Sequence, residues 1–97
     1  MTRIKLAASA LRDLDRIREF LLTHDEPNEP ERMQELLAAL HVLTYAPEIG
    51  RRVSVDRREL VIGRNARGYV AQYRYMRPTD TVLIMAVRHQ RESPVRR

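Results

Sequence analysis

The sequence contains no cysteine, and its three glycines stand apart from one another. Without cysteine the chain has no disulfide framework, no thiolate nucleophile and no thiolate metal site. The isolated glycines, Gly50, Gly63 and Gly68, are typical of turns and form no glycine-rich phosphate loop. His24 and His41 lie far apart, and no His/Asp/Glu cluster has the spacing of metal ligands. We therefore expect neither a metal ion nor another cofactor.

Long apolar runs are also missing. No stretch approaches the ~18 apolar residues that are needed to cross a membrane, so we expect no membrane partner. No long apolar region follows the charged residues between Met1 and Leu6, so the sequence predicts no secretory signal. Together with the lack of cysteine, this favours a cytoplasmic protein.

Charged residues are distributed unevenly along the 97 residues. Residues 1–50 contain 6 Lys/Arg and 9 Asp/Glu, whereas residues 51–97 contain 12 Lys/Arg and 4 Asp/Glu. The net charge therefore changes from −3 in the first half to +8 in the second. This asymmetry indicates either a basic surface that faces an acidic or polyanionic partner, or an incidental clustering of solvated charges. A chain of this length makes one domain, which we expect to span residues 1–97.

The first half of the chain predicts a short strand and two helices. Alternation from Thr2 to Leu6 indicates the strand. A helix follows to about Leu22, with Ser9 as its N-cap and an apolar stripe of Leu11, Leu14, Ile17 and Leu21. A second helix begins at Asn28, which with Glu31 resembles a capping box, and ends near Ala46 before Pro47. Its apolar stripe consists of Met33, Leu36, Leu37, Leu40 and Leu43.

The second half predicts three strands after a basic loop at residues 47–57. The strands are Glu59–Ile62, Tyr69–Met76 and Val82–Val87, with turns at Asn65–Gly68 and Pro78–Asp80. The last strand is continuously apolar, which favours a central strand covered on both faces. The alternating tyrosines of the middle strand could stack on bases, but their period of two favours core positions under the helices.

These segments predict an α+β fold with the order β-α-α-β-β-β. We expect the helical hairpin to pack on one face of a mostly antiparallel sheet. The other face would then be partly open and flanked by arginines, with Arg74 pointing toward it.

Several short motifs follow one another in a characteristic order along nearly the whole chain. No single motif is specific for a family, but their ordered combination is. They are Ala10, Asp13, Leu14 and Ile17; Leu36, Leu40 and Leu43; Pro47 to Arg51; Arg58 to Leu60; Tyr69 to Arg74; and Val82 to Val87 followed by His89. This combination resembles the RelE/ParE superfamily of type II toxins. The resemblance implies a cognate antitoxin as partner and a toxin–antitoxin hetero-oligomer.

Two activities occur in this superfamily, so the resemblance leaves the cellular target open. RelE-like members cleave mRNA on the ribosome, and ParE-like members inhibit DNA gyrase. RelE-like nucleases resemble one another in an arginine after a Gly-Tyr pair, whereas Val70 follows Gly68-Tyr69 here. The lysines of the preceding strand and the tyrosine near the C-terminus, which are also typical of these nucleases, are missing.

A metal-independent mRNA endoribonuclease needs groups that transfer protons and a cation for the phosphate. If the chain is such an enzyme, the remaining catalytic candidates are His89, which could act near neutral pH, and Arg74 and Arg64 as phosphate contacts. A single histidine beside a strand end is more often structural or solvated. The set of catalytic residues is therefore incomplete.

A gyrase inhibitor needs a protein-binding surface and no catalysis of its own. The run from Arg88 to Arg91 after the last strand is similar to that of ParE-like toxins, although a solvated terminus would look the same. We therefore favour a ParE-like toxin, with the ribosome and mRNA as the alternative target and a degenerate relative as a third possibility. The expected target contacts are Arg58, Arg74, Arg88, His89 and Arg91.

The antitoxin is expected to lay an acidic segment along the toxin and to fold as it binds. Such a segment would cover the edge of the helical hairpin and the basic open face, because opposite charge orients the encounter. The expected antitoxin contacts are Leu36, Leu40, Arg51, Arg58 and Arg74.

Overall fold

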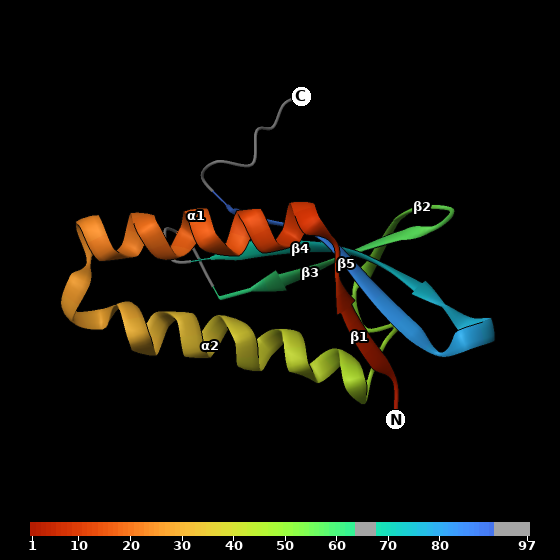
Figure 1. Ribbon diagram of the computed structural model, residues 1–97. Coiled ribbons are helices and arrows are strands. Elements are labelled where there is room, and N and C mark those ends of the chain that lie inside the picture. Colours follow the sequence, from red (N-terminus) through yellow and green to blue (C-terminus); the bar gives the residue numbers. More distant parts are fainter. Residues whose placement is uncertain (64–67, 91–97) are drawn as a thin grey trace.

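The computed structural model describes residues 1–63 and 68–90, which form two helices and a five-stranded sheet (Figure 1). Three short 3-10 turns, η1, η2 and η4, connect these elements. The elements in chain order are β1 (Arg3–Leu6), α1 (Ala8–His24), η1 (Glu26–Asn28), α2 (Glu29–His41), η2 (Val42–Thr44), β2 (Arg51–Ser54), β3 (Arg57–Ile62), β4 (Tyr69–Met76), η4 (Arg77–Thr79) and β5 (Thr81–His89).

The strands are arranged in the order β1-β5-β4-β3-β2. Only β1 and β5 pair in parallel, and every other neighbouring pair is antiparallel. The predicted α+β fold with a mostly antiparallel sheet is therefore confirmed. The apolar strand β5 is internal, as expected. The expectation that both of its faces are covered is wrong, because the two helices lie on one face and Leu83, Met85 and Ala86 are only half-buried.

The core lies between the helices and one face of the sheet. Helix α1 buries its stripe of Leu14, Ile17 and Leu21, and Tyr73 of β4 is fully buried beneath the helices, as the strand period predicted. Leu11, which we assigned to the stripe of α1, is 53% exposed because Ala10 takes the inward position instead. The remaining core residues are Leu36, Leu40, Leu43, Ile62, Tyr69, Ala71, Val82, Ile84 and Val87.

Two predicted helix caps are wrong. Helix α1 begins at Ala8, two residues before the expected start, so Ser9 lies inside it and donates its hydroxyl to the Met85 carbonyl oxygen at 2.6 Å. Asn28 precedes α2 as expected, but its side chain makes no cap hydrogen bond and instead donates to Asp25 Oδ1 at 2.9 Å.

Strand β2 differs from the prediction, because the sequence pattern predicts a loop at residues 47–57. All four of its residues are exposed, so no apolar alternation marks them as a strand. Val55 and Asp56 connect β2 to β3 as a two-residue turn, and the resulting hairpin places β2 at the edge of the sheet. The turn expected at Asn65–Gly68 lies almost wholly outside the described residues. No helix in the described part of the chain is long and apolar enough to span a membrane.

Candidate functional site

The sheet face away from the helices, called here the open face, has an apolar centre and a basic margin. At the centre Val61 of β3 lies opposite Val70 of β4, and Val61 is 59% exposed. The residues that share this face by strand register are Arg3, Lys5, Arg51, Glu59, Gln72, Arg74, Leu83, Ala86 and Arg88. Cations therefore outnumber the single carboxylate of Glu59, which accepts from Arg51 and Gln72 at 3.2 Å each.

Arg74 lies on the open face, as the sequence predicted, and Arg88 lies there too, because β5 extends to His89 and does not end at Val87 as expected. Both are exposed. Arg74 Nε is 3.9 Å from Asp56 Oδ2 in the turn between β2 and β3, a loose contact between two side chains that are each about half exposed. An exposed pair of this kind contributes little to stability, so Arg74 is available to a partner.

Arg58 does not join this face, although we expected it to act with Arg74. By register it lies opposite Tyr73, whose side chain is buried on the helix-covered side. Its guanidinium donates to the carbonyl oxygens of Glu48 at 3.0 Å and Gly50 at 2.9 Å. Arg58 therefore supports the loop that leads into β2.

Leu36 and Leu40 are core residues, with 1% and 4% of their surface exposed. An antitoxin cannot contact them without displacing the sheet, so the expectation that they form its binding surface does not fit their burial. On α2 the exposed apolar side chain is Leu37, at 48%. The rotation of α2 about its axis determines that Leu36 and Leu40 are buried and Leu37 is exposed. The apolar stripe in the sequence contains all three and does not distinguish them.

The structure separates the candidate nuclease residues. His89 packs edge-on against the ring of Tyr69, with ring centroids 5.3 Å apart, on the helix-covered side of the sheet. Arg74 lies five residues after Tyr69 on β4, which corresponds to about 17 Å along the strand at the usual rise per residue. Its side chain also points to the opposite face of the sheet. Arg64 and the target-contact candidate Arg91 lie outside the described residues. No group of three His, Cys, Asp or Glu in the described ranges could hold a metal ion.

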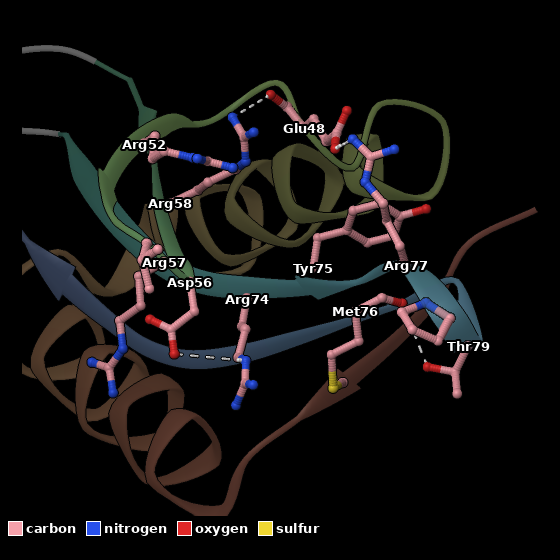
Figure 2. A pocket seen from close by; sticks show the side chains of 12 residues that line it. Glu48, Arg52, Asp56, Arg57, Arg58, Arg74, Tyr75, Met76, Arg77 and Thr79 are labelled. Atoms are coloured by element: carbon pink, nitrogen blue, oxygen red, sulfur yellow. Dashed lines mark hydrogen bonds and ion pairs between the residues drawn. The ribbon is translucent and has the colours of Figure 1, made fainter.

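At one end of the sheet a cleft of about 520 Å³ opens between the β2–β3 turn and the β4–β5 turn (Figure 2). We call it the arginine cleft. Five arginines line it: Arg52, Arg57, Arg58, Arg74 and Arg77. Only two carboxylates, those of Glu48 and Asp56, accompany them, and each pairs with an arginine, Glu48 with Arg77 and Asp56 with Arg74. Its apolar lining consists of Val55, Met76, Pro78 and the ring of Tyr75.

A hydrogen-bonded cluster at Asp80 includes Tyr75, whose side chain lines this cleft. Asp80 Oδ1 accepts from Thr2 Oγ1 at 2.7 Å and from Tyr75 Oη at 2.8 Å. These two hydrogen bonds lower the pKa of the Asp80 carboxyl, and the bond to Asp80 raises the pKa of the Tyr75 hydroxyl. Asp80 is thus ionised and Tyr75 protonated at neutral pH, which makes the cluster a structural support rather than a proton-transfer pair.

Sequence reasoning identified Arg58 and Arg74 but missed the other residues of the cleft. Arg52 and Arg57 lie in the run Arg51-Arg52-Val53-Ser54-Val55-Asp56-Arg57-Arg58, whose charge density was the only available signal. The hairpin that brings this run beside Arg77 was not predicted.

Comparison with known proteins gives a consistent result. The family described as "ParE toxin of type II toxin-antitoxin system, parDE" matches residues 4–94. The chain is 34% identical over 92 residues to Toxin RelE3 of Caulobacter vibrioides, which covers 95% of this chain and 98% of that protein.

Two solved structures show the same fold. The chromosomal ParDE system of P. aeruginosa aligns with a TM-score of 0.75 and 19% identity, over 92% of this chain and 96% of the other. The intact E. coli RelBE toxin–antitoxin complex aligns with a TM-score of 0.65 and 14% identity, again over 92% and 96%.

Proposed function

Because the chain belongs to the ParE/RelE family of type II toxins, we propose that it arrests growth by inhibiting DNA gyrase and that a cognate antitoxin neutralises it in the cytoplasm. A gyrase inhibitor needs a surface that recognises a large protein complex. It does not need a group that transfers a proton.

The observation that carries this proposal is the separation of His89 from Arg74. RNA cleavage requires a proton-transfer group and a phosphate-binding cation within reach of the same phosphodiester, that is, within a few ångströms of one another. Here the two side chains occupy opposite faces of the sheet, and His89 rests on Tyr69. RelE-like nucleases share an arginine directly after a Gly-Tyr pair. Val70 takes that position here and supplies no charge.

The open face is the surface we assign to the target. Its apolar pair, the exposed Val61 and the half-buried Val70, is bordered by Arg74 and Arg88, and neither arginine is held in a tight ion pair with another described residue. Protein interfaces commonly combine an apolar centre with arginines at its margin. Arg58 contributes indirectly, because it holds the loop beside the face.

The test is a supercoiling assay with purified gyrase and relaxed plasmid, run beside a translation assay with ribosome-bound mRNA. We expect the toxin to inhibit supercoiling and to leave the mRNA intact. The same toxin preincubated with its antitoxin is the control and should not inhibit. Codon-periodic cleavage of the mRNA without any effect on supercoiling would overturn the gyrase proposal and favour the RelE-like activity.

A further inference from the structure

The β2–β3 hairpin places two arginines directly opposite one another. Arg52 of β2 and Arg58 of β3 are cross-strand partners, and Figure 2 shows their side chains converging at the arginine cleft. Like charges at directly opposed positions of two strands destabilise the pairing. Arg58 donates to two carbonyl oxygens, which orient its guanidinium but leave its charge unneutralised. This pair therefore carries a charge that a bound anion would neutralise.

A second pair of arginines lies where the pairing between β3 and β4 ends. The last pair of that ladder is Arg58 with Tyr73, so Arg57 and Arg74 occupy the next position on each strand. Figure 2 shows them on either side of Asp56. The Asp56 carboxylate is 3.9 Å from Arg74 Nε, and both of these side chains are about half exposed. A single loose carboxylate of this kind screens two guanidinium groups only weakly.

The charges of the arginine cleft do not balance. Its lining contains five arginines and two carboxylates, and five minus two gives a formal net charge of +3. Arg52 and Arg57 have no carboxylate partner among the described residues. One phosphate monoester carries a charge of about −1.5 to −2 near pH 7, so it would leave part of this charge unneutralised. The excess charge therefore favours a ligand with two or more adjoining phosphates.

The size and lining of the cleft favour a compact ligand over a strand of nucleic acid. Its volume of about 520 Å³ lies within the range of small-molecule sites. Guanidinium groups bind phosphate oxygens through two parallel hydrogen bonds, which suits several arginines around one anion. Proteins that bind single-stranded nucleic acid add aromatic rings on which successive bases stack. Among the described residues of the lining, Tyr75 is the one aromatic, and it is half-buried with its hydroxyl bound to Asp80.

We propose that the arginine cleft binds a polyphosphate anion, with its phosphates at Arg57 and Arg74 and extending toward Arg52. The phosphate chain of a nucleotide and inorganic polyphosphate share this chemistry. A nucleotide would gain apolar contact for its base, because Met76 and Pro78 also line the cleft. This site goes beyond the proposed function, because its occupancy does not depend on the cellular target.

Titration calorimetry with the full chain tests the class of ligand. The probes are ATP, tripolyphosphate and inorganic phosphate, each in about 150 mM NaCl without divalent cations, so that screening is the same for all three. We expect ATP and tripolyphosphate to bind at least about tenfold more tightly than inorganic phosphate, because only they place adjoining phosphates on more than one arginine. Tighter binding of ATP than of tripolyphosphate would identify a nucleotide site, and equal binding a site for the phosphate chain alone. Equal affinity for all three probes, or no binding, would overturn the proposal.

Variants that remove one charge locate the site. We expect Arg57→Gln to weaken tripolyphosphate binding at least about fivefold, whereas Arg12→Gln, which changes an exposed arginine of α1, binds as the parent chain does. Circular dichroism checks that both variants are folded. Unchanged affinity in folded Arg57→Gln would contradict the assignment to the cleft. So would a loss of affinity that is confined to a single-stranded DNA of about 20 nucleotides, because the cleft would then belong to a nucleic-acid surface.

A gain-of-affinity variant and a spectroscopic measurement do not depend on the folding of Arg57→Gln. Asp56→Asn removes the carboxylate beside Arg74, so we expect the affinity for tripolyphosphate to rise about threefold. In the parent chain, the Nε–H resonances of Arg52, Arg57 and Arg74 should shift on saturation with tripolyphosphate, while that of Arg12 does not move. Shifts confined to arginines outside the cleft would exclude it as the binding site.

Discussion

Tyr73 and Gly50 hold the loop before β2 against the sheet through one buried contact. The Gly50 amide donates to Tyr73 Oη at 2.8 Å, and a Cβ at Gly50 would lie 2.7 Å from the same oxygen and 2.8 Å from the Glu59 carbonyl oxygen. Burial raises the pKa of the Tyr73 hydroxyl, so it stays protonated while it accepts this bond. Glycine is therefore required at position 50 by space, and the hydroxyl is required at position 73.

Tyr73→Phe leaves the buried Gly50 amide without its acceptor. We expect the free energy of unfolding to fall by about 1–3 kcal/mol, the usual cost of an unsatisfied buried donor. Urea denaturation followed by circular dichroism measures this loss. Tyr45→Phe is the control, because Tyr45 is 69% exposed and should change stability little. Equal stability of the two variants would contradict the role assigned to Tyr73.

Asp80→Asn tests the cluster that joins the N-terminus to the β4–β5 turn. Asparagine tolerates the left-handed backbone at this position, where φ is 49°, so the substitution changes charge with little strain. The folded-state pKa of Asp80 lies below its unfolded value of 3.8, so its ionised form stabilises the fold at neutral pH. That contribution is lost as pH falls through the lowered pKa. We expect the urea midpoints of the variant and the parent to differ at pH 7 and to approach one another as pH falls through the lowered pKa; a pH-independent difference would exclude this linkage.

At the scale of elements, side chains of α1 form hydrogen bonds with the backbone of β5 beyond the point where β1 ends. Beyond Leu6 the backbone of β5 has no parallel strand beside it. Side chains of the helix replace that strand: Asp13 Oδ2 accepts from the Val87 amide at 2.9 Å, and Ser9 donates to the Met85 carbonyl oxygen. Helix and sheet are thus joined by hydrogen bonds as well as by the apolar core.

Asp13→Ala should therefore destabilise the protein by about 1–3 kcal/mol, because it leaves the Val87 amide unpaired. Asp15→Ala on the same helix is exposed, and we expect it to stay within about 0.5 kcal/mol of the parent. Thermal unfolding gives the difference, and faster hydrogen exchange of the Val87 amide locates it. An Asp13→Ala variant as stable as Asp15→Ala would exclude this contact as a link between helix and sheet.

The elements that sequence predicts well are those with one apolar side. The stripe of α1 and the alternation around Tyr73 in β4 identified both elements and the faces they bury. Strand β2 lacks such a signal because it is exposed on both faces at the sheet edge. The cleft forms where the pairing between β3 and β4 ends, at Arg58 opposite Tyr73. Strand register and sheet twist determine this point, and local sequence does not. The alternation of β4 therefore predicted the face of Arg74. It could not predict that Arg57 and Arg77 lie in the same cleft.

At the scale of the whole molecule, opposite charges are separated onto different layers. The first half of the chain, which forms both helices, has a net charge of −3, and the second half, which forms four of the five strands, has +8. A charge distribution of this kind would orient the encounter with an acidic partner toward the basic sheet.

The association rate of toxin and antitoxin should therefore depend on salt. We expect the rate constant to fall at least about tenfold between ~50 and ~500 mM NaCl, because screening removes electrostatic steering. Stopped-flow mixing with a fluorescently labelled antitoxin measures it. A rate that does not change with salt would show that the charge separation is not used in this encounter.

Under the proposed function, growth arrest depends on the open face of the sheet and not on a catalytic site. The most direct measurement is the concentration of toxin that half-inhibits gyrase supercoiling for Arg88→Glu and for Arg12→Glu, which reverse the same charge on opposite layers. We predict that Arg88→Glu requires at least about ten times more toxin, as for an arginine that anchors an interface, and that Arg12→Glu matches the parent. Equal inhibition by the two variants, or a loss confined to Arg12→Glu, would contradict the claim.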